Sequence, residues 1–148
     1  MEVLNQMKIS FLSKSENESF SRAAVSSFIA QLDPRIDELG DIRTAVSEAV
    51  TNAIVHAYRT KPGVVTVSVK ITDKRCVYIQ INDRGCGIED VEKAKEPLFT
   101  TAANEERAGL GFAVMESFMD KLTVRSRVGY GTSVSMMKKL ADNETEDK

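Results

Sequence analysis

The stretch DIRTAVSEAVTNAIVHAYR, from Asp41 to Arg59, carries the strongest periodicity in the sequence. Its apolar residues recur at the i, i+3, i+4, i+7 spacing that places side chains on one face of a helix. These residues are Ile42, Ala45, Val46, Ala49, Val50, Ala53, Ile54 and Ala57. The spacing predicts a helix over 41–59 that buries a single stripe and ends at Lys61-Pro62-Gly63.

Three polar residues, Glu48, Asn52 and His56, follow one edge of this stripe at i, i+4, i+8 spacing. An amide oxygen can bind a hard cation such as Mg²⁺, and a carboxylate one turn away can orient or deprotonate a hydroxyl. The same residues would also suit a solvated helix flank, and His56 fits a structural role better than a catalytic one. The helix alone leaves both interpretations open.

Strand patterns lie on both sides of this helix. Residues 3–11 place Val3, Met7, Ile9 and Phe11 on one face, with Asn5 breaking the alternation. Two antiparallel hairpins are predicted later, over 65–81 and 122–139, the second turning at 129–131. The first hairpin alternates apolar and polar residues, which predicts one buried face and one wet face.

Further helices are expected at 15–32, 89–95 and 111–119. Ser15 and Glu18 fit a capping box for the first of these. Its predicted inward residues are Phe20, Ala23, Ala24, Ser27 and Phe28. The polar stretch from residue 96 to 110 is predicted to form a lid.

Because the strands cluster as hairpins, we predict an α+β two-layer sandwich, with a mixed, mostly antiparallel sheet covered on one face by helices. Residues 1–141 are expected to form a single domain. Residues 142–148, DNETEDK, have the composition of a disordered acidic tail.

A second motif, Asp83-Arg-Gly85-Cys-Gly87, follows the strand predicted at 77–81. Asp83 has the same parity as the apolar residues of that strand, so its carboxylate is expected on the helix side, where an unpaired charge is costly. The glycines allow a close backbone approach and positive φ. The motif therefore suits a pocket floor, although a tight turn with a capping aspartate has the same pattern.

A third motif, Gly109-Leu110-Gly111, opens the helix predicted at 111–119. Free amides at the start of a helix suit a phosphate group, although a glycine pair also serves ordinary turns. The Gly129-Tyr-Gly-Thr132 run is typical of a simple hairpin turn.

Composition excludes several classes of function. The sequence has 148 residues, with 42% apolar and 28% charged, which is typical of one globular domain. A net charge of −2 gives no nucleic-acid footprint, and no apolar run approaches the roughly 18 residues of a membrane span. Since the N-terminus lacks an apolar signal core, we expect a cytoplasmic protein. One histidine, and two cysteines that form no CxxC pair, argue against a zinc cluster or a disulfide framework.

Taken in order, the motifs resemble those of the Bergerat-fold (GHKL) ATPases, which include gyrase, histidine kinases and MutL. The matching motifs are Glu48-x-x-x-Asn52, Asp83-Arg-Gly85-Cys-Gly87, Phe99-Thr100-Thr101, Gly109-x-Gly111 and Gly-x-Gly-Thr132. Each motif is weak alone, but the ordered set is specific and covers essentially the whole chain. The resemblance implies the Bergerat ATP-binding fold.

Four stretches, 15–22, 46–53, 97–101 and 106–112, are similar to the anti-sigma F factors of endospore-forming bacteria. That resemblance implies a cytoplasmic serine kinase that forms a homodimer. It also implies two protein partners, a sporulation sigma factor that is sequestered and an anti-anti-sigma protein that is phosphorylated on serine. His56-Ala57 departs from the His-Gly expected in close relatives.

The resemblance also assigns roles, with ATP or ADP and Mg²⁺ as cofactors. Asn52 resembles the Mg²⁺ ligand and Glu48 the general base. Asp83 resembles the adenine-binding residue, in a pocket wall shared with Gly85 and Gly87.

The remaining assignments concern the phosphates and the partners. The residues that match lid and phosphate-binding elements are Thr100, Thr101, Gly109, Leu110 and Gly111, and Thr132 is grouped with the nucleotide-binding residues. Arg107 resembles the lid arginine that reaches the terminal phosphate. Arg22 resembles a partner-contacting arginine on the first helix.

Several alternatives remain beside the serine kinase. One is a nucleotide-gated sigma-binding module without phosphotransfer. Such a module does not need a carboxylate beside the metal ligand. Another is the equivalent anti-sigma kinase of a stress response. The catalytic half of a histidine kinase is disfavoured, since the one histidine, His56, lies inside the predicted ATP-domain helix.

Overall fold

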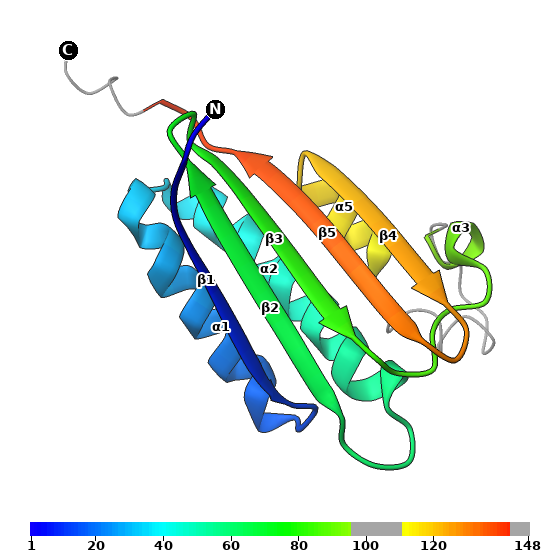
Figure 1. Cartoon of the computed structure of the whole chain (residues 1–148). Coiled ribbons are helices and arrows are strands. Elements are labelled where there is room, and N and C mark those ends of the chain that lie inside the picture. The colour runs from blue at the N-terminus through cyan, green and yellow to red at the C-terminus, as the bar shows by residue number, and fades with distance from the viewer. Residues whose placement is uncertain (96–110, 143–148) are drawn as a thin grey trace.

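The computed structural model describes residues 1–95 and 111–142. These residues form one five-stranded sheet with helices on one of its faces (Figure 1). The strands are β1 (Val3–Leu12), β2 (Val64–Thr72), β3 (Cys76–Asp83), β4 (Lys121–Arg127) and β5 (Gly131–Lys139). Their order is β1-β2-β3-β5-β4, and every pairing is antiparallel, so the described sheet is not mixed. The predicted α+β two-layer architecture is confirmed.

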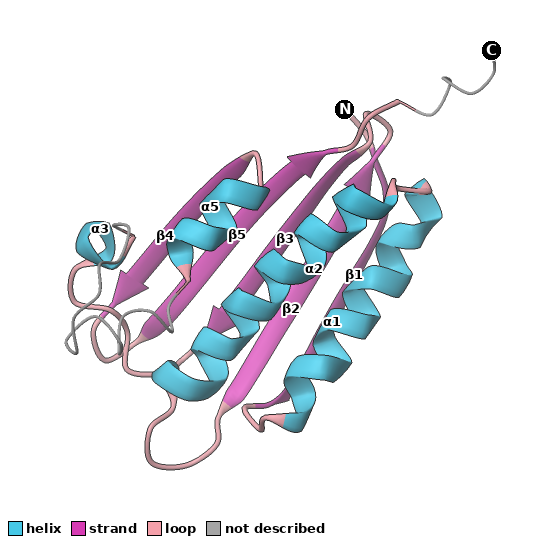
Figure 2. Cartoon of the chain, turned by 180° about the vertical axis from the view of Figure 1, so that it is seen from behind, coloured by secondary structure: helices cyan, strands magenta, loops and turns pink. Residues whose placement is uncertain are grey.

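The helices are α1 (Glu16–Ile29), α2 (Ile36–Thr51), α3 (Val91–Ala94) and α5 (Phe112–Phe118). A 3₁₀ turn, Ala30–Leu32, extends α1, and a π-helical turn, Asn52–Ala57, extends α2. Figure 2 shows α1, α2 and α5 side by side on the same face of the sheet. None of the helices in 1–95 and 111–142 is long and apolar enough to cross a membrane.

The core lies between α2 and the central strands. The predicted stripe of α2 is confirmed, since Ile42, Val46 and Val50 are completely buried. The alternating residues of the first hairpin face it as expected, and two residues of the second hairpin join them. The sheet residues that are buried here are Val65, Val67, Val69, Ile71, Val77, Ile79, Ile81, Val134 and Met136. Period-2 and period-3.6 patterns therefore meet in one apolar layer.

The bounds of α2 differ from the prediction at both ends. The helix begins at Ile36, before Asp41, because the buried Glu38 carboxylate accepts a hydrogen bond from the Arg35 backbone N–H at 2.9 Å. The second oxygen of Glu38 accepts from the Ala141 backbone N–H at 2.7 Å, which links the helix start to the chain after β5. At the other end, regular α-helix stops at Thr51 and the π turn follows.

Two predictions for α1 were wrong. Ser15 has helical backbone angles and its side chain makes no capping hydrogen bond, so the capping box is absent. The buried row is Ser21, Val25 and Ile29, whereas Phe20 is 52% exposed. Phe20 instead meets Phe11 edge-on, with ring centroids 6.2 Å apart. Ser21 is tolerated in the buried row because its hydroxyl donates to the Glu18 carbonyl at 2.9 Å.

The strand β1 lies at one edge of the sheet and pairs with β2. Its register shifts between Val3 and Asn5, where the sequence alternation also breaks.

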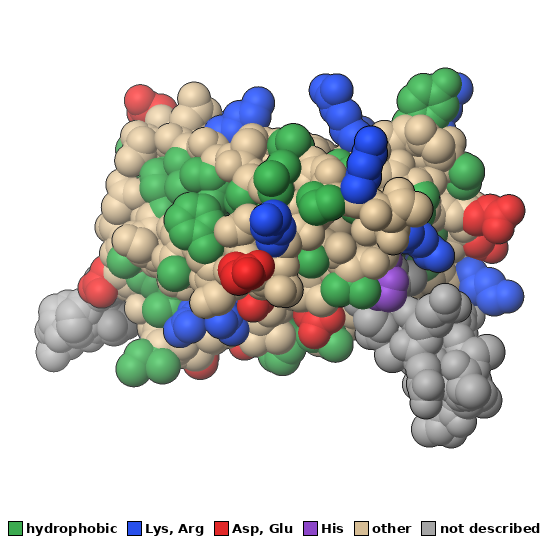
Figure 3. Space-filling view, turned by 90° about the horizontal axis from the view of Figure 1, so that it is seen from below, with side chains coloured by type: hydrophobic (Ala, Val, Ile, Leu, Met, Phe, Trp, Pro, Cys, Tyr) green, Lys and Arg blue, Asp and Glu red, His purple; other side chains and the backbone are tan. Residues whose placement is uncertain are grey.

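Basic and acidic side chains are interspersed over the face of the molecule seen from below (Figure 3). The nearly balanced charge of the sequence is thus also mixed in space on this face.

Candidate functional site

A cavity of about 420 Å³ opens between the end of α2, the central strands and the start of α5. Its walls are mostly apolar. The lining residues are Ala49, Asn52, His56, Ala57, Arg59, Ile81, Asp83, Cys86, Gly87, Ile88, Glu89, Phe112, Val128, Thr132 and Val134. A concave apolar pocket with a few polar groups is the usual form of a small-molecule site.

Asp83 is the last residue of β3 and is partly buried in this cavity. Its Oδ1 accepts the backbone N–H of Gly85 at 2.9 Å and that of Thr132 at 3.2 Å. Burial raises the pKa of the carboxyl above its ordinary value, and the two backbone donors oppose that shift. Because both hydrogen bonds fall on Oδ1, the other oxygen remains for a ligand in the cavity.

The glycines after Asp83 let this loop pack closely against two other backbone segments, at Ala57 and at Val128. A Cβ on Gly85 would meet the backbone of Ala57, the residue whose carbonyl accepts the Cys86 N–H at 2.9 Å. Gly87 has φ of +80°, and a Cβ there would lie 2.9 Å from the Val128 Cα. Both glycines therefore permit close backbone approach, as predicted. Gly87 lines the cavity, whereas Gly85 lies outside its lining.

Asn52 lies at the point where α2 changes into the π turn. It is 8% exposed and lines the cavity together with His56. Single π turns of this kind are frequent at functional sites. The π turn could not be predicted from the sequence, because the apolar spacing of these residues also fits a regular α-helix.

Glu48 is one helical turn before Asn52 but does not line the cavity. It lies against Gly111, the residue that precedes α5 and has a left-handed φ of +59°. Burial raises the pKa of the Glu48 carboxyl above its ordinary value. The carboxylate is thus placed at the start of α5, at the rim of the cavity.

Arg22 is on α1, away from the cavity. Its guanidinium forms an ion pair with Glu18 at 3.7 Å and is 36% exposed. It shares a second hollow with Glu48, between α1 and α2. The structure therefore connects the candidate partner residue with the candidate base, which lie far apart in the sequence.

The structure brings together Asn52, Asp83, Gly87 and Thr132 around one cavity, with Glu48 and Gly111 in contact beside it. Five other candidates, Thr100, Thr101, Arg107, Gly109 and Leu110, lie outside the described residues.

The apolar lining of the cavity was not predicted from the sequence as part of the site. Ile81 and Val134 could have been found from strand parity, since each faces the helices. Phe112 and Val128 could not, because their contribution depends on how α5 and the β4–β5 turn pack.

Comparison with known proteins places this geometry in context. A family model described as a histidine kinase-like ATPase domain matches residues 13–138. An anti-sigma F factor of Caldanaerobacter subterraneus subsp. tengcongensis is 57% identical, covering 97% of this chain and 99% of that protein. An anti-sigma F factor of Geobacillus kaustophilus is 50% identical, covering 95% of this chain and 96% of that protein.

Among solved structures, the RsbU and RsbW domains of Rv1364c from Mycobacterium tuberculosis match with a TM-score of 0.67. The match covers 92% of this chain and 32% of that one, at 19% identity. At that identity the likeness concerns the fold alone, and it agrees with the sheet and helix arrangement described above.

Proposed function

We propose that this protein is an ATP-dependent serine kinase that sequesters a sporulation sigma factor. The premise is that the chain belongs to the anti-sigma F factors, within the histidine kinase-like ATPase family. Its phosphorylation substrate is the anti-anti-sigma protein that antagonises this sequestration. The observation that carries the proposal is the placing of Glu48 and Asn52 beside a cavity with Asp83 in its lining.

The cavity fits an adenine nucleotide. Its mostly apolar wall suits a flat base, and the Asp83 carboxylate can accept a hydrogen from the exocyclic amino group of adenine. Guanine carries a carbonyl at that position and cannot donate there. The Gly85 and Thr132 amides hold the carboxylate in place before the base arrives.

Asn52 is the residue that would hold Mg²⁺, since an amide oxygen is a ligand of the kind this cation prefers. Within 1–95 and 111–142, no three acidic, histidine or cysteine side chains gather in a way that could hold a metal. Mg²⁺ usually takes one or two protein ligands and completes its shell with phosphates and water. When bound there, Mg²⁺ would supply positive charge that offsets the charge of the phosphates.

Glu48 is the proposed general base. It accepts the proton of the substrate serine as the hydroxyl oxygen bonds to the terminal phosphorus and ADP leaves. Partial burial suits this role, because a carboxylate with a raised pKa is a better proton acceptor. We assign phosphate binding to Gly111, as its motif predicts, together with Thr100, Thr101, Gly109 and Leu110. Contact with the terminal phosphate is assigned to Arg107.

The remaining parts of the proposal concern assembly. Arg22 contacts the protein partners, and the chain acts as a homodimer in the cytoplasm. The edge strand β1 is a candidate for the dimer contact, because its outer backbone groups and the exposed Leu4 need covering. Sedimentation at micromolar concentration tests this, and a monomer would refute it.

The decisive experiment incubates the purified protein with labelled ATP, Mg²⁺ and an anti-anti-sigma protein from the same organism. The proposal expects label on a serine of that protein, and loss of the label with Glu48→Gln. Nucleotide-dependent sigma binding without any label would favour the sequestering module. Preference for a stress-response sigma factor would favour the equivalent stress kinase.

A further inference from the structure

A second hollow, of about 310 Å³, lies between α1 and α2 and is separate from the nucleotide cavity. It is lined by Arg22, Gly40, Arg43, Thr44, Ser47 and Glu48. We propose that this hollow receives the phosphoacceptor segment of the protein substrate, and that Arg43 binds a carboxylate side chain of that segment. The inference rests on the proposed kinase function and adds a docking site and a specificity residue to it.

The shape of the hollow suits an extended segment. Gly40, Thr44 and Glu48 are on successive turns of one face of α2, so the hollow runs about 12 Å along the helix. About four residues of extended chain span that length. A Cβ built on Gly40 would meet no atom within 4 Å apart from its own chain neighbours and the surrounding helix backbone, which leaves this end of the hollow open.

The charges of the hollow select an acidic segment. Arg22 is paired with Glu18 on its own helix. Arg43 is exposed and forms no ion pair among the residues that the structure describes. A guanidinium binds a carboxylate through two parallel hydrogen bonds, which fixes orientation as well as charge. Glu48 is the one acidic residue of the lining, and it must stay available for the substrate hydroxyl.

The position of Glu48 shows which end of the hollow is nearest to the nucleotide cavity. This residue lines the hollow and also lies against Gly111, at the start of α5 beside the nucleotide cavity. Phosphoryl transfer needs the attacking and leaving oxygens on opposite sides of the phosphorus. A substrate that enters along α2 reaches Glu48 from the hollow, whereas a nucleotide in the cavity lies on the other side, toward Asn52 and Phe112. This arrangement is compatible with in-line transfer.

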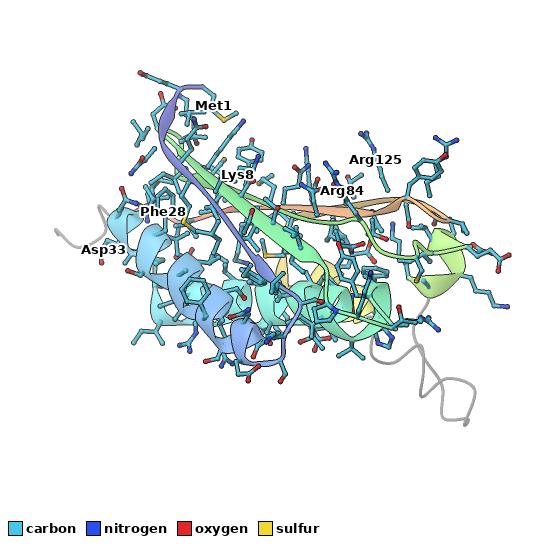
Figure 4. All side chains as sticks on the ribbon, turned by 60° about the horizontal axis from the view of Figure 1, so that its bottom comes forward. Met1, Lys8, Phe28, Asp33, Arg84 and Arg125 are labelled. Carbon is cyan, nitrogen blue, oxygen red and sulfur yellow. The ribbon has the colours of Figure 1, made fainter. Side chains whose placement is uncertain are left out.

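The test compares Arg43→Glu with Arg125→Glu, which makes the same change of charge on the opposite side of the sheet from the helices (Figure 4). Phosphorylation of the anti-anti-sigma protein from the same organism is measured at varied concentrations of that protein. For Arg43→Glu we expect the KM for this substrate to rise about tenfold or more, with kcat and ATP affinity unchanged. Arg125→Glu should leave all three unchanged.

A second variant tests the hollow without altering its charge. Gly40→Gln places a long side chain in the open end and replaces glycine with a better helix former, so folding is preserved. It too should raise the substrate KM and spare ATP binding. Wild-type KM values in both Arg43→Glu and Gly40→Gln would overturn the inference.

The inference can fail separately from the proposed function. If the wild-type protein transfers no phosphate, the kinase proposal fails, and calorimetric affinity for the same anti-anti-sigma protein then decides the docking site. Arg43→Glu should weaken that complex about tenfold or more, and equal affinity would overturn the inference. A double-mutant cycle against each acidic residue of the substrate should find one carboxylate whose loss costs little once Arg43 is alanine.

Discussion

Glu48 and Gly111 are in direct contact, although 63 positions separate them in the sequence. A Cβ added to Gly111 would lie 2.8 Å from the Glu48 carboxyl carbon and closer still to one of its oxygens. Gly111 also has a left-handed φ of +59°, which L side chains rarely adopt. The carboxylate of the candidate base therefore occupies space that is free only because residue 111 has no side chain.

Gly111→Ala should lower both stability and phosphotransfer. The left-handed backbone costs about 1–2 kcal/mol with a Cβ, and the contact with Glu48 adds to it. Gly129→Ala is the matched control, since Gly129 has φ of +85° but a Cβ there meets nothing. Thermal unfolding should show the larger loss for Gly111→Ala, and the excess should shrink in a Glu48→Ala background. Equal losses at the two glycines would contradict the contact.

Asp83→Asn should weaken ATP and ADP alike. Loss of a buried, charge-assisted hydrogen bond costs about 1.5–3 kcal/mol, which is roughly ten- to a hundredfold in affinity. Calorimetric titration measures the effect, with Asp37→Asn on the exposed start of α2 as the control. If Asp83→Asn binds ATP as well as the wild type does, the adenine contact is assigned to the wrong residue.

Substitutions at Glu48 and Asn52 should separate chemistry from binding. Glu48→Gln should keep nucleotide and sigma-factor binding but lose about 10²–10⁴-fold in phosphotransfer, the range of general base catalysis. Asn52→Ala should impair Mg²⁺-dependent ATP binding as well as transfer, because a metal ligand is removed. Single-turnover assays and ATP titrations at several Mg²⁺ concentrations distinguish the two. A wild-type rate of phosphotransfer in Glu48→Gln would show that this carboxylate has no catalytic role and only belongs to the solvated side of the helix.

The raised pKa of Glu48 predicts two opposite effects of pH. Phosphotransfer needs the ionised carboxylate, so its rate should fall as the pH drops through a value above the ordinary glutamate pKa. Burial of that charge makes the native state less stable above this pKa, and the cost disappears once the group is protonated. Glu48→Gln should thus raise Tm at pH 7, and its advantage should vanish in acid. A constant difference in Tm across the pH range would contradict this.

Arg22→Glu should weaken the complexes with both protein partners by about 2 kcal/mol or more, as hot-spot arginines do. ATP affinity should be unchanged, because Arg22 does not line the nucleotide cavity. Binding assays with the sigma factor and with the anti-anti-sigma protein measure the two effects. A variant that loses ATP binding, or that keeps both partners at full affinity, would show that this residue is wrongly placed.

Local pattern predicted the sheet better than the first helix. The hairpins around Asp73 and Tyr130 follow from period-2 alternation and turn residues, and both have the expected positions. The α1 helix was found, but its buried row was shifted by one residue. Phe20 is one of two phenylalanines in that helix, yet it is exposed and packs against Phe11, because the end of β1 offers it an aromatic partner.

The sequence by itself determined the layer architecture and the face of the sheet on which the Asp83 side chain lies. Both depend on periodicity, which is a property of neighbouring residues. Only the tertiary structure decided that Asn52 belongs to a π turn, that Glu48 is outside the nucleotide cavity, and that Glu48 shares a hollow with Arg22. These relationships depend on how α1, α2 and α5 pack against one sheet. Helix packing is set by side chains distant in the chain, and no local pattern records it.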